Sequence, residues 1–510
     1  MKPLIHKTRR TWNEPGHAHY LTHPCCRRLP LLRAVAVFAA SVAFLTPSAA
    51  DESDIELLDV PLTPKIARQC FQEAQRLCEQ DAGRLWGVSL YGPILFADPK
   101  TRAVIASQAD PAGLLTQQDG VFVGTLPPEE TIAGTAKDWA GITWVMLPWP
   151  LPKEKRERMH FLTHEMFHRV QPKLGLSAAE IGRSAKGGTT THLDTRDGRV
   201  WLQLEWRALQ AALKHSDPER RRAITDALTF RAYRRALFPN AAAGERADEL
   251  AEGLAEYTGV RLSADSDSAA IERALSNFER AKHWPTLTRS FAYVSGPAYG
   301  LLLDRAKPDW RSGLSVSDDL GALLRQALSL DRESLLSLDR ESLLGPTTRR
   351  SPERIPPKTG RERNLAPAKE LEAAAKERAK AYAVDELIAA ETARELAKGD
   401  LVAKHRQRFV TGPVLIIPIH SMQFQFDPRD IRPLDDLGKV YPKMKMSDAW
   451  GILEVTGGAL IANDWSKVVV PAPPDPNARP LTGAGWTLEL NAGWELHAAK
   501  RKGDYIVEQK

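Results

Sequence analysis

The stretch His164-Glu165-Met166-Phe167-His168 decides how the chain is interpreted, because it combines two imidazoles and a carboxylate at a spacing that suits a hydrolytic zinc site. Residues four apart on a helix lie one turn above each other, so His164 and His168 can reach one metal ion. Glu165 would lie beside that ion and act on a bound water. The pattern therefore predicts a helix that carries two Zn²⁺ ligands and a general base.

The motif is predicted to lie on an amphipathic helix that begins near Pro152 and ends at Pro172. On a helical wheel, the two histidines and Glu165 fall on the side opposite an apolar stripe. We therefore expect one side of the helix to pack on a core and the other to face a cleft. The apolar stripe consists of Met159, Leu162, Met166 and Val170.

A catalytic zinc site needs three protein ligands and an open position for water, so a third ligand must come from another element. The strongest candidate is Glu252, which lies 84 residues after the second histidine of the motif, in a helix predicted over residues 245–257. In that helix Glu249, Glu252 and Glu256 share one face, and a bound cation would offset their mutual repulsion. Glu205, in the intervening segment, is the rival ligand.

At this point the sequence resembles the gluzincin metallopeptidases, the group that includes thermolysin and aminopeptidase N. The string Ala251-Glu252-Gly253-Leu254-Ala255 is similar to the Asn-Glu-Gly-Phe-Ala-like string that follows the zinc helix in that group. The resemblance implies a zincin-like fold and zinc-dependent hydrolysis of peptide bonds. It also implies His164, His168 and Glu252 as zinc ligands, with Glu165 as the base.

The resemblance further suggests a tyrosine that stabilises an oxyanion. Tyr293-Val294-Ser295-Gly296 is similar to the Tyr-x-Lys-Gly string of aminopeptidase-N-like enzymes, with Ser295 in place of the lysine. Tyr293 is therefore the candidate, with Tyr299 behind it. A tyrosine that only fills the core is the competing interpretation.

Two departures from the family pattern occur within the matching region, which covers roughly residues 85–305. The gap to Glu252 is much longer than in the two named families, so an inserted helical segment must fold away from the ligand. No Gly-x-Met-Glu-Asn string, which holds a free amino terminus in aminopeptidase N, precedes the motif. This absence argues against exopeptidase specificity.

Further side chains near the motif are expected to support the ligands. A ligating histidine usually donates its second ring nitrogen to a carboxylate or a carbonyl. Glu256, one turn after Glu252, or Glu249, one turn before it, is expected to play this part. His160 and His192 also lie near the motif, but single histidines are more often surface or core residues than ligands.

These residues predict a zinc metallopeptidase that acts on a peptide or protein substrate. Zinc lowers the pKa of its water to about 7, Glu165 takes the proton, and Tyr293 donates to the oxyanion. A strand predicted at Ile142–Leu147 would offer a sheet edge to an extended substrate, or would be a purely structural edge. Two alternatives stay open: an envelope-associated binding or scaffold protein with an inert zincin-like domain, and a zinc hydrolase of a non-peptide substrate.

Residues 1–50 have the features of a signal peptide. An uncharged apolar run, Ala34 to Leu45, follows arginines and ends in small residues before Asp51. This run is shorter than the about 20 residues that span a bilayer. We expect an exported protein, periplasmic or secreted, with no transmembrane segment after cleavage; an uncleaved N-terminal anchor is the alternative.

Residues 51–510 carry 63 basic and 63 acidic residues, so the pI near 9.0 does not indicate a nucleic-acid partner.

Only two cysteines, Cys70 and Cys78, follow this leader. They fall in one predicted helix, Pro64 to Gln80, in which eight residues rise about 12 Å, beyond the ~7 Å Cα separation that a disulfide spans. We therefore expect two free, buried thiols.

The whole pattern predicts an α+β protein in three parts after the leader. They are a zincin-like catalytic domain at 51–344, a Pro/Arg-rich linker and charged helix at 345–408, and a β-rich domain, sandwich or barrel, at 409–510. Ala368 to Lys398 is expected to form one long solvated helix. The eight-residue repeat SLDRESLL, at 329–344, is expected to lengthen a surface helix.

Individual elements are predicted from periodicity. Around the motif, the predicted strands are Val88–Leu90, Ile94–Ala97, Ala103–Ala106, Val121–Val123 and Ile142–Leu147, and the further helices are Val200–Lys214, Pro218–Leu237, Ala269–Ala281 and Ala298–Arg305. In the β-rich domain, the predicted strands are Val414–Ile419, Met422–Phe426, Gly451–Val455, Ala459–Ala462, Val468–Val470, Trp486–Leu490 and Tyr505–Val507. Four tryptophans there are expected to be core residues rather than a sugar-binding platform: Trp450, Trp465, Trp486 and Trp494.

Overall fold

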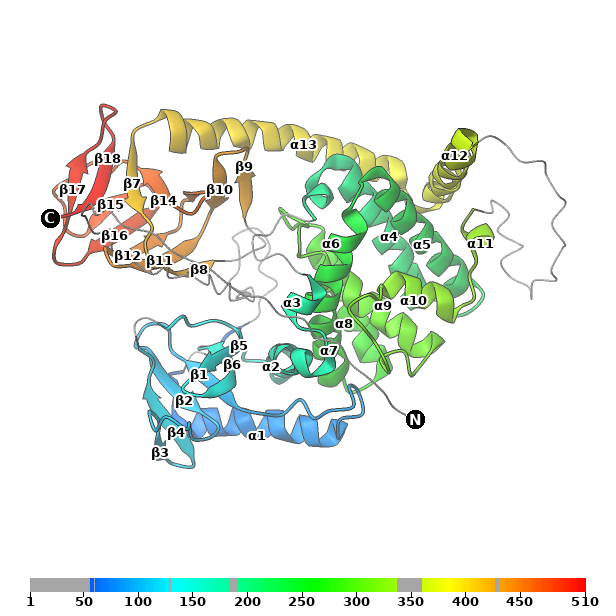
Figure 1. Cartoon of the computed structure of the whole chain (residues 1–510), viewed down its shortest axis with the longest axis horizontal. Helices are drawn as coiled ribbons and strands as arrows, with labels where there is room; N and C mark the ends of the chain where they lie inside the picture. Colours follow the sequence, from blue (N-terminus) through cyan, green and yellow to red (C-terminus); the bar gives the residue numbers. More distant parts are fainter. Residues whose placement is uncertain (1–55, 59, 128–129, 183–189, 337–359, 427–430) are drawn as a thin grey trace, which may run out of the picture. The chain divides into compact units, whose positions relative to one another are not determined.

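The computed structural model describes residues 56–58, 60–127, 130–182, 190–336, 360–426 and 431–510, and the predicted leader lies outside these ranges. Within them, a mixed sheet and a set of helices are followed by an all-β region (Figure 1), which confirms the predicted combination of helices and sheets. None of the helices in the described part of the chain is both long enough and apolar enough to cross a membrane.

A six-stranded sheet forms near the start of the described chain. Its strands are β1 Ile94–Ala97, β2 Ala103–Ala106, β3 Thr116–Gln118, β4 Val121–Thr125, β5 Thr135–Trp139 and β6 Ile142–Pro148. They lie in the order β3-β4-β2-β1-β6-β5. Only the β1–β6 pair is parallel; the other neighbouring strands are antiparallel.

The central strands of this sheet bury side chains on both faces. Ile94 and Phe96 of β1 belong to the large apolar cluster that includes the helix α1 (Pro64–Asp81), whereas Leu95 and Ala97 belong to a smaller cluster on the opposite face. Phe71 of α1 stacks on Phe96 with ring centroids 4.7 Å apart. Because side chains alternate between two covered faces, these strands are continuous apolar runs.

The strand order corrects the predicted sheet edge. β6 lies between β1 and β5, so Ile142–Leu147 is interior and β5 is the edge strand. β5 joins β6 through a two-residue turn in which Ala140 and Gly141 both have positive φ (50° and 82°), as a type I′ turn requires. Two charged residues interrupt the apolar pattern of β5, so hydrophobic periodicity does not predict this strand. The segment Val88–Leu90, predicted as a strand, is irregular.

Residues 155–336 are mainly helical where they are described. The helices are α2 Lys155–Val170, α3 Ala178–Ile181, α4 Arg196–Lys214, α5 Glu219–Leu237, α6 Ala241–Asp248, α7 Leu254–Ser263, α8 Asp267–Ala281, α9 Ala292–Ala306, α10 Leu320–Ala327 and α11 Arg332–Leu336, with the 3₁₀ turns η1 Gln171–Leu174 and η2 Thr191–Asp194 and the π-helical turn η3 Glu249–Gly253. The predicted ranges agree with α2, α4, α5 and α8, whereas α9 begins earlier and holds Tyr293 in its first turn. The first copy of the repeat ends in α11, and the second copy lies outside the described residues.

The charged segment after the repeat forms two helices instead of the one predicted. They are α12 (Gly360–Ala379) and α13 (Val384–Arg406), separated at Ala383, whose φ of 48° is left-handed. The predicted solvated face is wrong at Arg378 and Glu391, which are 3% and 5% exposed.

Buried ion pairs attach these two helices to α5 and α4. Arg378 pairs with Asp226 of α5, and Glu391 pairs with Arg199 of α4. Leu387 of α13 is buried in the same apolar cluster as the helices. Residues 345–359 of the Pro/Arg-rich linker, predicted over 345–367, lie outside the described residues, and residues 360–367 belong to α12.

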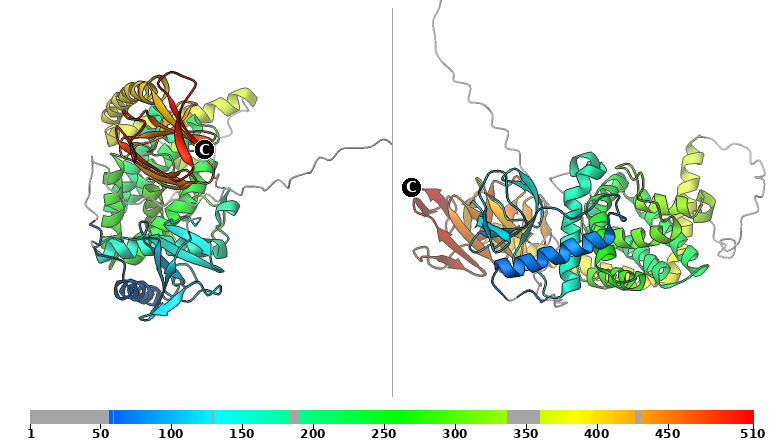
Figure 2. Two further views of the ribbon diagram at one scale, coloured as in Figure 1. Left: turned by 90° about the vertical axis from the view of Figure 1, so that its left-hand side faces the viewer. Right: turned by 90° about the horizontal axis from the view of Figure 1, so that it is seen from below.

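From β7 onward the described residues form two sheets around one apolar core, drawn in orange and red in Figure 2. The strands are β7 Val414–Pro418, β8 Gln423–Phe426, β9 Arg432–Leu434, β10 Gly438–Tyr441, β11 Met444–Asp448, β12 Gly451–Val455, β13 Ala459–Ala462, β14 Lys467–Pro471, β15 Leu481–Gly483, β16 Trp486–Leu490, β17 Trp494–Ala498 and β18 Tyr505–Gln509. One sheet has the order β17-β18-β7-β14-β13-β10-β9 and the other β15-β16-β12-β11-β8, which is a sandwich rather than a single closed barrel. All the strands predicted here are present; β9, β10, β11, β15 and β17 were not predicted.

The tryptophans of this sandwich are mainly structural. Trp450 and Trp486 are buried, and their indole N–H groups donate to the carbonyl oxygens of Pro418 and Pro471 at 2.7 and 3.0 Å. Trp465 and Trp494 are partly buried against the same core. The prediction of core residues is thus confirmed for the first pair.

The cysteines Cys70 and Cys78 are free and buried in α1, as predicted. Burial raises the pKa of Cys70 to about 11 and that of Cys78 to about 12. Because the thiolate is the reactive form, we expect both thiols to react slowly with Ellman's reagent at pH 8 in the folded protein and quickly in guanidinium chloride. For this measurement, the two cysteines of the leader, Cys25 and Cys26, are replaced by serine. Fast reaction of either remaining thiol in the folded protein would contradict this assignment.

The ion pair between Arg378 and Asp226 predicts a large effect on stability. Arg378→Met would remove the cationic partner of the buried Asp226 carboxylate, which the Tyr382 hydroxyl also contacts at 2.9 Å. We expect the free energy of unfolding to fall by about 3–5 kcal/mol, measured by urea denaturation. Lys376→Met is the matched control on the same helix, because the Lys376–Glu372 pair is exposed and screened by solvent, so its loss should change the stability far less. Equal effects of the two substitutions would show that α12 is not anchored by Arg378.

Candidate metal centre

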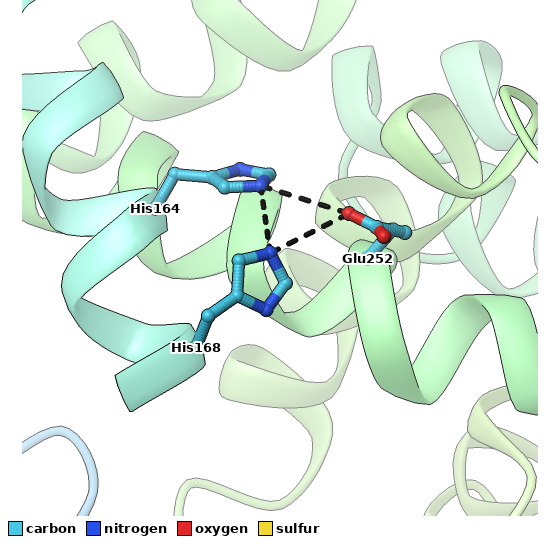
Figure 3. Close-up of side chains that lie close together, drawn as sticks. All are labelled: His164, His168 and Glu252. Atoms are coloured by element: carbon cyan, nitrogen blue, oxygen red, sulfur yellow. Dashed lines mark hydrogen bonds and ion pairs between the residues drawn. The ribbon is translucent and has the colours of Figure 1, made fainter. Parts of the chain in front are cut away.

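Three side chains from two helical segments converge on one point (Figure 3). His164 Nε2 and His168 Nε2, on α2, lie 3.2 Å apart. Glu252 Oε2, on η3, lies 3.5 Å from His168 Nε2 and 3.8 Å from His164 Nε2. In the described part of the chain, this is the one group of three acidic, histidine or cysteine side chains close enough to hold a metal ion.

The spacing of these three atoms suits a single zinc ion. Ligand bonds of about 2.0–2.1 Å in a tetrahedron put neighbouring donor atoms ~3.4 Å apart. The three separations in the structure, 3.2, 3.5 and 3.8 Å, lie on either side of that value. Two imidazole nitrogens and one carboxylate oxygen are also the donors of known catalytic zinc sites.

The second nitrogen of each imidazole is occupied by a side chain that orients the ring. His164 Nδ1 lies 3.1 Å from Glu256 Oε2, and His168 Nδ1 lies 2.8 Å from Gln171 Oε1. Gln171 in turn donates to the carbonyl oxygens of Leu250 and Ala251 at 3.1 and 3.0 Å. An Nδ1–H that donates to an oxygen leaves the Nε2 lone pair free, so both rings are held ready for a cation.

Of the two expected supporting carboxylates, the structure places only Glu256 beside a histidine. Glu249 instead bonds Arg231 of α5, with an Nη1 to Oε1 distance of 2.8 Å. The prediction that Glu249, Glu252 and Glu256 share one face is wrong for Glu249, because Glu249–Gly253 is a π-helical turn. Glu252 and Glu256 both contact His164, with Oε2 at 3.8 Å from its Nε2 and at 3.1 Å from its Nδ1, respectively.

The rival ligand Glu205 lies in a different environment. It accepts hydrogen bonds from Arg231 at 3.2 Å, from Tyr299 at 2.7 Å and from Arg234, and it is fully buried. Glu205 and Tyr299 therefore belong to an arginine-rich cluster and are not brought to the histidines. His192 is not brought to the motif histidines either; its Nε2 lies 2.9 Å from Glu245.

Tyr293 is brought to the candidate metal ligands by the close approach of α9 to η3. Its hydroxyl donates to Glu252 Oε2 at 2.8 Å, and its ring stacks on that of His164 with centroids 5.7 Å apart. Two glycines permit this approach: a Cβ at Gly296 would lie 2.3 Å from Gly253 Cα. In the structure the hydroxyl thus holds the carboxylate of Glu252.

Glu165 is fully buried, and neither of its carboxylate oxygens has a hydrogen-bond partner. Its Oε1 lies 4.0 Å from His164 Nε2. Burial is the main reason why the pKa of Glu165 lies well above its usual value; Glu252 and Glu256 add to the effect, and His164 opposes it. Buried polar atoms without partners are rare in proteins, so this carboxyl group is a candidate functional residue.

The carboxylates around His164 favour a positive charge at that point. Burial alone would lower the pKa of His164, but its hydrogen bonds to Glu252 and Glu256 and the charge of Glu165 outweigh burial and raise the pKa to about 10. A cation held between the imidazoles and Glu252 would satisfy the same negative charges.

The polar side of α2 is more enclosed than predicted. We expected it to face a cleft, but His164 is 3% exposed, because α7 packs along this side of α2. The apolar stripe through Met159 and Met166 is buried as predicted. Both sides of the motif helix are therefore covered in this structure.

Protein-family models, curated proteins and solved structures were compared with the chain, and none of them matches it. The function is therefore inferred from the arrangement of the side chains.

The glycine contact between η3 and α9 yields a direct prediction. The Cβ of Gly296→Ala would overlap the backbone of Gly253, so the two segments must separate, moving Tyr293 away from Glu252. We expect a loss of ~1–3 kcal/mol in unfolding free energy, measured by urea denaturation, and weaker zinc binding in a chelator competition.

The matched control for this substitution is Gly399→Ala in α13, where an added Cβ meets no atom within 4 Å. Replacing an exposed helical glycine by alanine stabilises a helix by roughly 0.5–1 kcal/mol. Wild-type zinc affinity in Gly296→Ala would mean that the glycine contact does not position Glu252.

Proposed function

We propose that this protein is an exported zinc metallopeptidase of the gluzincin type, with a zincin-like catalytic domain within residues 51–344. The observation that carries the proposal is the convergence of His164, His168 and Glu252 beside the unpartnered carboxylate of Glu165. This is the division of roles that metal-assisted hydrolysis requires, since three groups hold the ion and a fourth moves a proton.

The ligand atoms follow from the hydrogen bonds. His164 and His168 bind through Nε2, because Nδ1 of each ring is engaged with Glu256 or Gln171. Glu252 binds through Oε2, the oxygen that lies nearest to both imidazoles. When bound there, Zn²⁺ supplies a Lewis acid that polarises a carbonyl group and acidifies a water.

Glu165 moves the proton in this proposal. Its carboxylate takes a proton from the attacking water and gives it to the leaving nitrogen of the scissile amide. Its raised pKa makes the carboxylate a stronger base than that of an ordinary glutamate, which suits the removal of a proton from the attacking water. Neither carboxylate oxygen of Glu165 has a hydrogen-bond partner in the structure, so either one can accept the proton.

Tyr293 is the proposed oxyanion donor. Its hydroxyl now donates to Glu252 Oε2, so it must turn from that ligand to the substrate oxygen as negative charge develops there. A donor of this kind contributes a few kcal/mol to transition-state stabilisation, commonly about 3. In the resting protein the same hydroxyl keeps Glu252 in place.

The edge strand β5 is the proposed docking site for an extended peptide. β5 pairs with β6 along one side only, and it packs near α2. Strand addition at this edge would let main-chain hydrogen bonds hold substrates of varied sequence. The strand β6, predicted as the docking edge, is interior, and its neighbour β5 takes that role.

Substitution of the base tests the proposed function. In the full chain loaded with one equivalent of zinc, we expect Glu165→Gln to bind zinc and to lower kcat for hydrolysis of a mixed peptide library by about 10²–10⁴-fold, because the amide cannot take a proton. Product formation followed by mass spectrometry measures the rate, and removal of zinc by a chelator should abolish it.

Glu157→Gln is the control on the same helix, because Glu157 pairs with Arg273 and does not contact the histidines. It should retain wild-type kcat. Hydrolysis that survives in Glu165→Gln, or a wild-type protein that binds no zinc, contradicts the proposal. Zinc-dependent turnover of esters or non-peptide amides with no peptide cleavage would assign a different substrate class to the same centre.

A further inference from the structure

A third imidazole lies on α2 one turn before the metal ligands. His160 is buried, and its Nε2 lies 3.1 Å from Glu256 Oε2. The same carboxylate oxygen lies 3.1 Å from His164 Nδ1. One oxygen of Glu256 is thus shared by two imidazoles of the motif helix, one of which belongs to a candidate metal ligand.

The sharing of this oxygen defines where the protons lie. An ionised carboxylate accepts hydrogen bonds only, so each imidazole must present an N–H to it. His164 then carries its proton on Nδ1 and keeps the Nε2 lone pair for the metal. His160 carries its proton on Nε2, and its Nδ1 is left without a hydrogen-bond partner, as the structure has it.

Glu256 is held from its other side as well. Asn277 of α8 donates to Glu256 Oε1 at 3.1 Å and also donates to the carbonyl oxygen of Tyr293 at 3.1 Å. The oxygen of Asn277 accepts a hydrogen bond from Arg280. Together with the two imidazoles, these contacts place Glu256 in one orientation and favour its ionised form, because every contact to its oxygens comes from a donor.

The packing around His160 restricts its ring to one orientation. Gly259 of α7 faces it, and a Cβ there would lie 3.0 Å from the carbonyl oxygen of His160 and 3.2 Å from its Nδ1. Since Nε2 is directed to Glu256, the ring is not placed to ligate the ion bound by His164 and His168.

We propose that His160 is a positioning residue for the metal centre: acting through Glu256, it holds His164 in the Nδ1–H tautomer with Nε2 directed to the ion. The motif helix therefore carries three functional imidazoles, His160, His164 and His168, spaced one turn apart. This inference rests on the metal site of the proposed function and assigns a role to a residue outside its ligand set.

Zinc affinity tests the role of His160 without any assay of hydrolysis. In the full chain, competition with a chromogenic zinc chelator should show that His160→Leu binds zinc more weakly, by up to the roughly 10–100-fold that loss of a group bonded directly to a ligand costs. His160→Gln, whose amide can donate to Glu256, should restore the affinity to within a few-fold of wild type. In a Glu256→Gln background, His160→Leu should cause little further loss, because the interaction through which it acts is already broken.

The control is His192→Leu, which removes a partly buried imidazole that contacts a carboxylate, Glu245, away from the proposed metal ligands. It should leave zinc affinity unchanged, whatever its effect on unfolding measured in excess chelator. Wild-type zinc affinity in His160→Leu overturns the proposal, as does a glutamine variant as weak as the leucine variant. A wild-type chain that binds no zinc overturns the proposed function and this inference together.

A measurement on the unsubstituted protein covers the case in which His160→Leu does not fold. Long-range proton–nitrogen spectra of the zinc-loaded chain with ¹⁵N-labelled histidine report the tautomer of each ring. We expect His160 protonated on Nε2 and His164 protonated on Nδ1. A proton on Nδ1 of His160 would overturn the proposal, because that ring could not then donate to Glu256.

Discussion

The carboxylate of Glu252 lies 3.5 and 3.8 Å from two imidazole nitrogens because its segment is wound as a π-helix next to α7, which packs on α2. In a regular α-helix, the carboxylates of Glu249, Glu252 and Glu256 would crowd one face. The π-helical turn sets Glu249 apart: it binds an arginine, whereas Glu252 and Glu256 both contact His164. In the proposed centre, Glu252 is a ligand, Glu249 anchors the turn, and Glu256 orients His164.

The long segment between the motif and Glu252 supports this arrangement. α4 contributes Glu205 and α5 contributes Arg231, and the same arginine bonds Glu249 in the π-helical turn that carries Glu252. Tyr299 of α9 completes the cluster. Because buried charges are costly without partners, this network permits few alternative arrangements of η3. Through Arg231 and Glu249, the inserted helices thus anchor the turn that carries Glu252, the proposed third ligand.

The histidine motif could be predicted because four-residue spacing on a helix is enough to place His164 and His168 on one face. Glu252 could be named from its local string, but its approach to the histidines depends on the π-helical turn, which leaves no periodic signal. Gln171 was missed because its role depends on where α2 ends; its position three residues after His168 and just before Pro172 was the available signal. Arg378 was assigned to solvent because its buried partner lies 152 residues away in sequence.

The central claim is that one zinc ion is held by two imidazole nitrogens and a carboxylate oxygen. X-ray absorption at the zinc edge, on the full chain loaded with one equivalent of zinc, tests it most directly. The account predicts a first shell of nitrogen and oxygen atoms at about 2.0–2.1 Å with the scattering pattern of two imidazoles, and the loss of one imidazole in both His164→Ala and His168→Ala. A shell that contains sulfur, or one that is unchanged by either substitution, would contradict it.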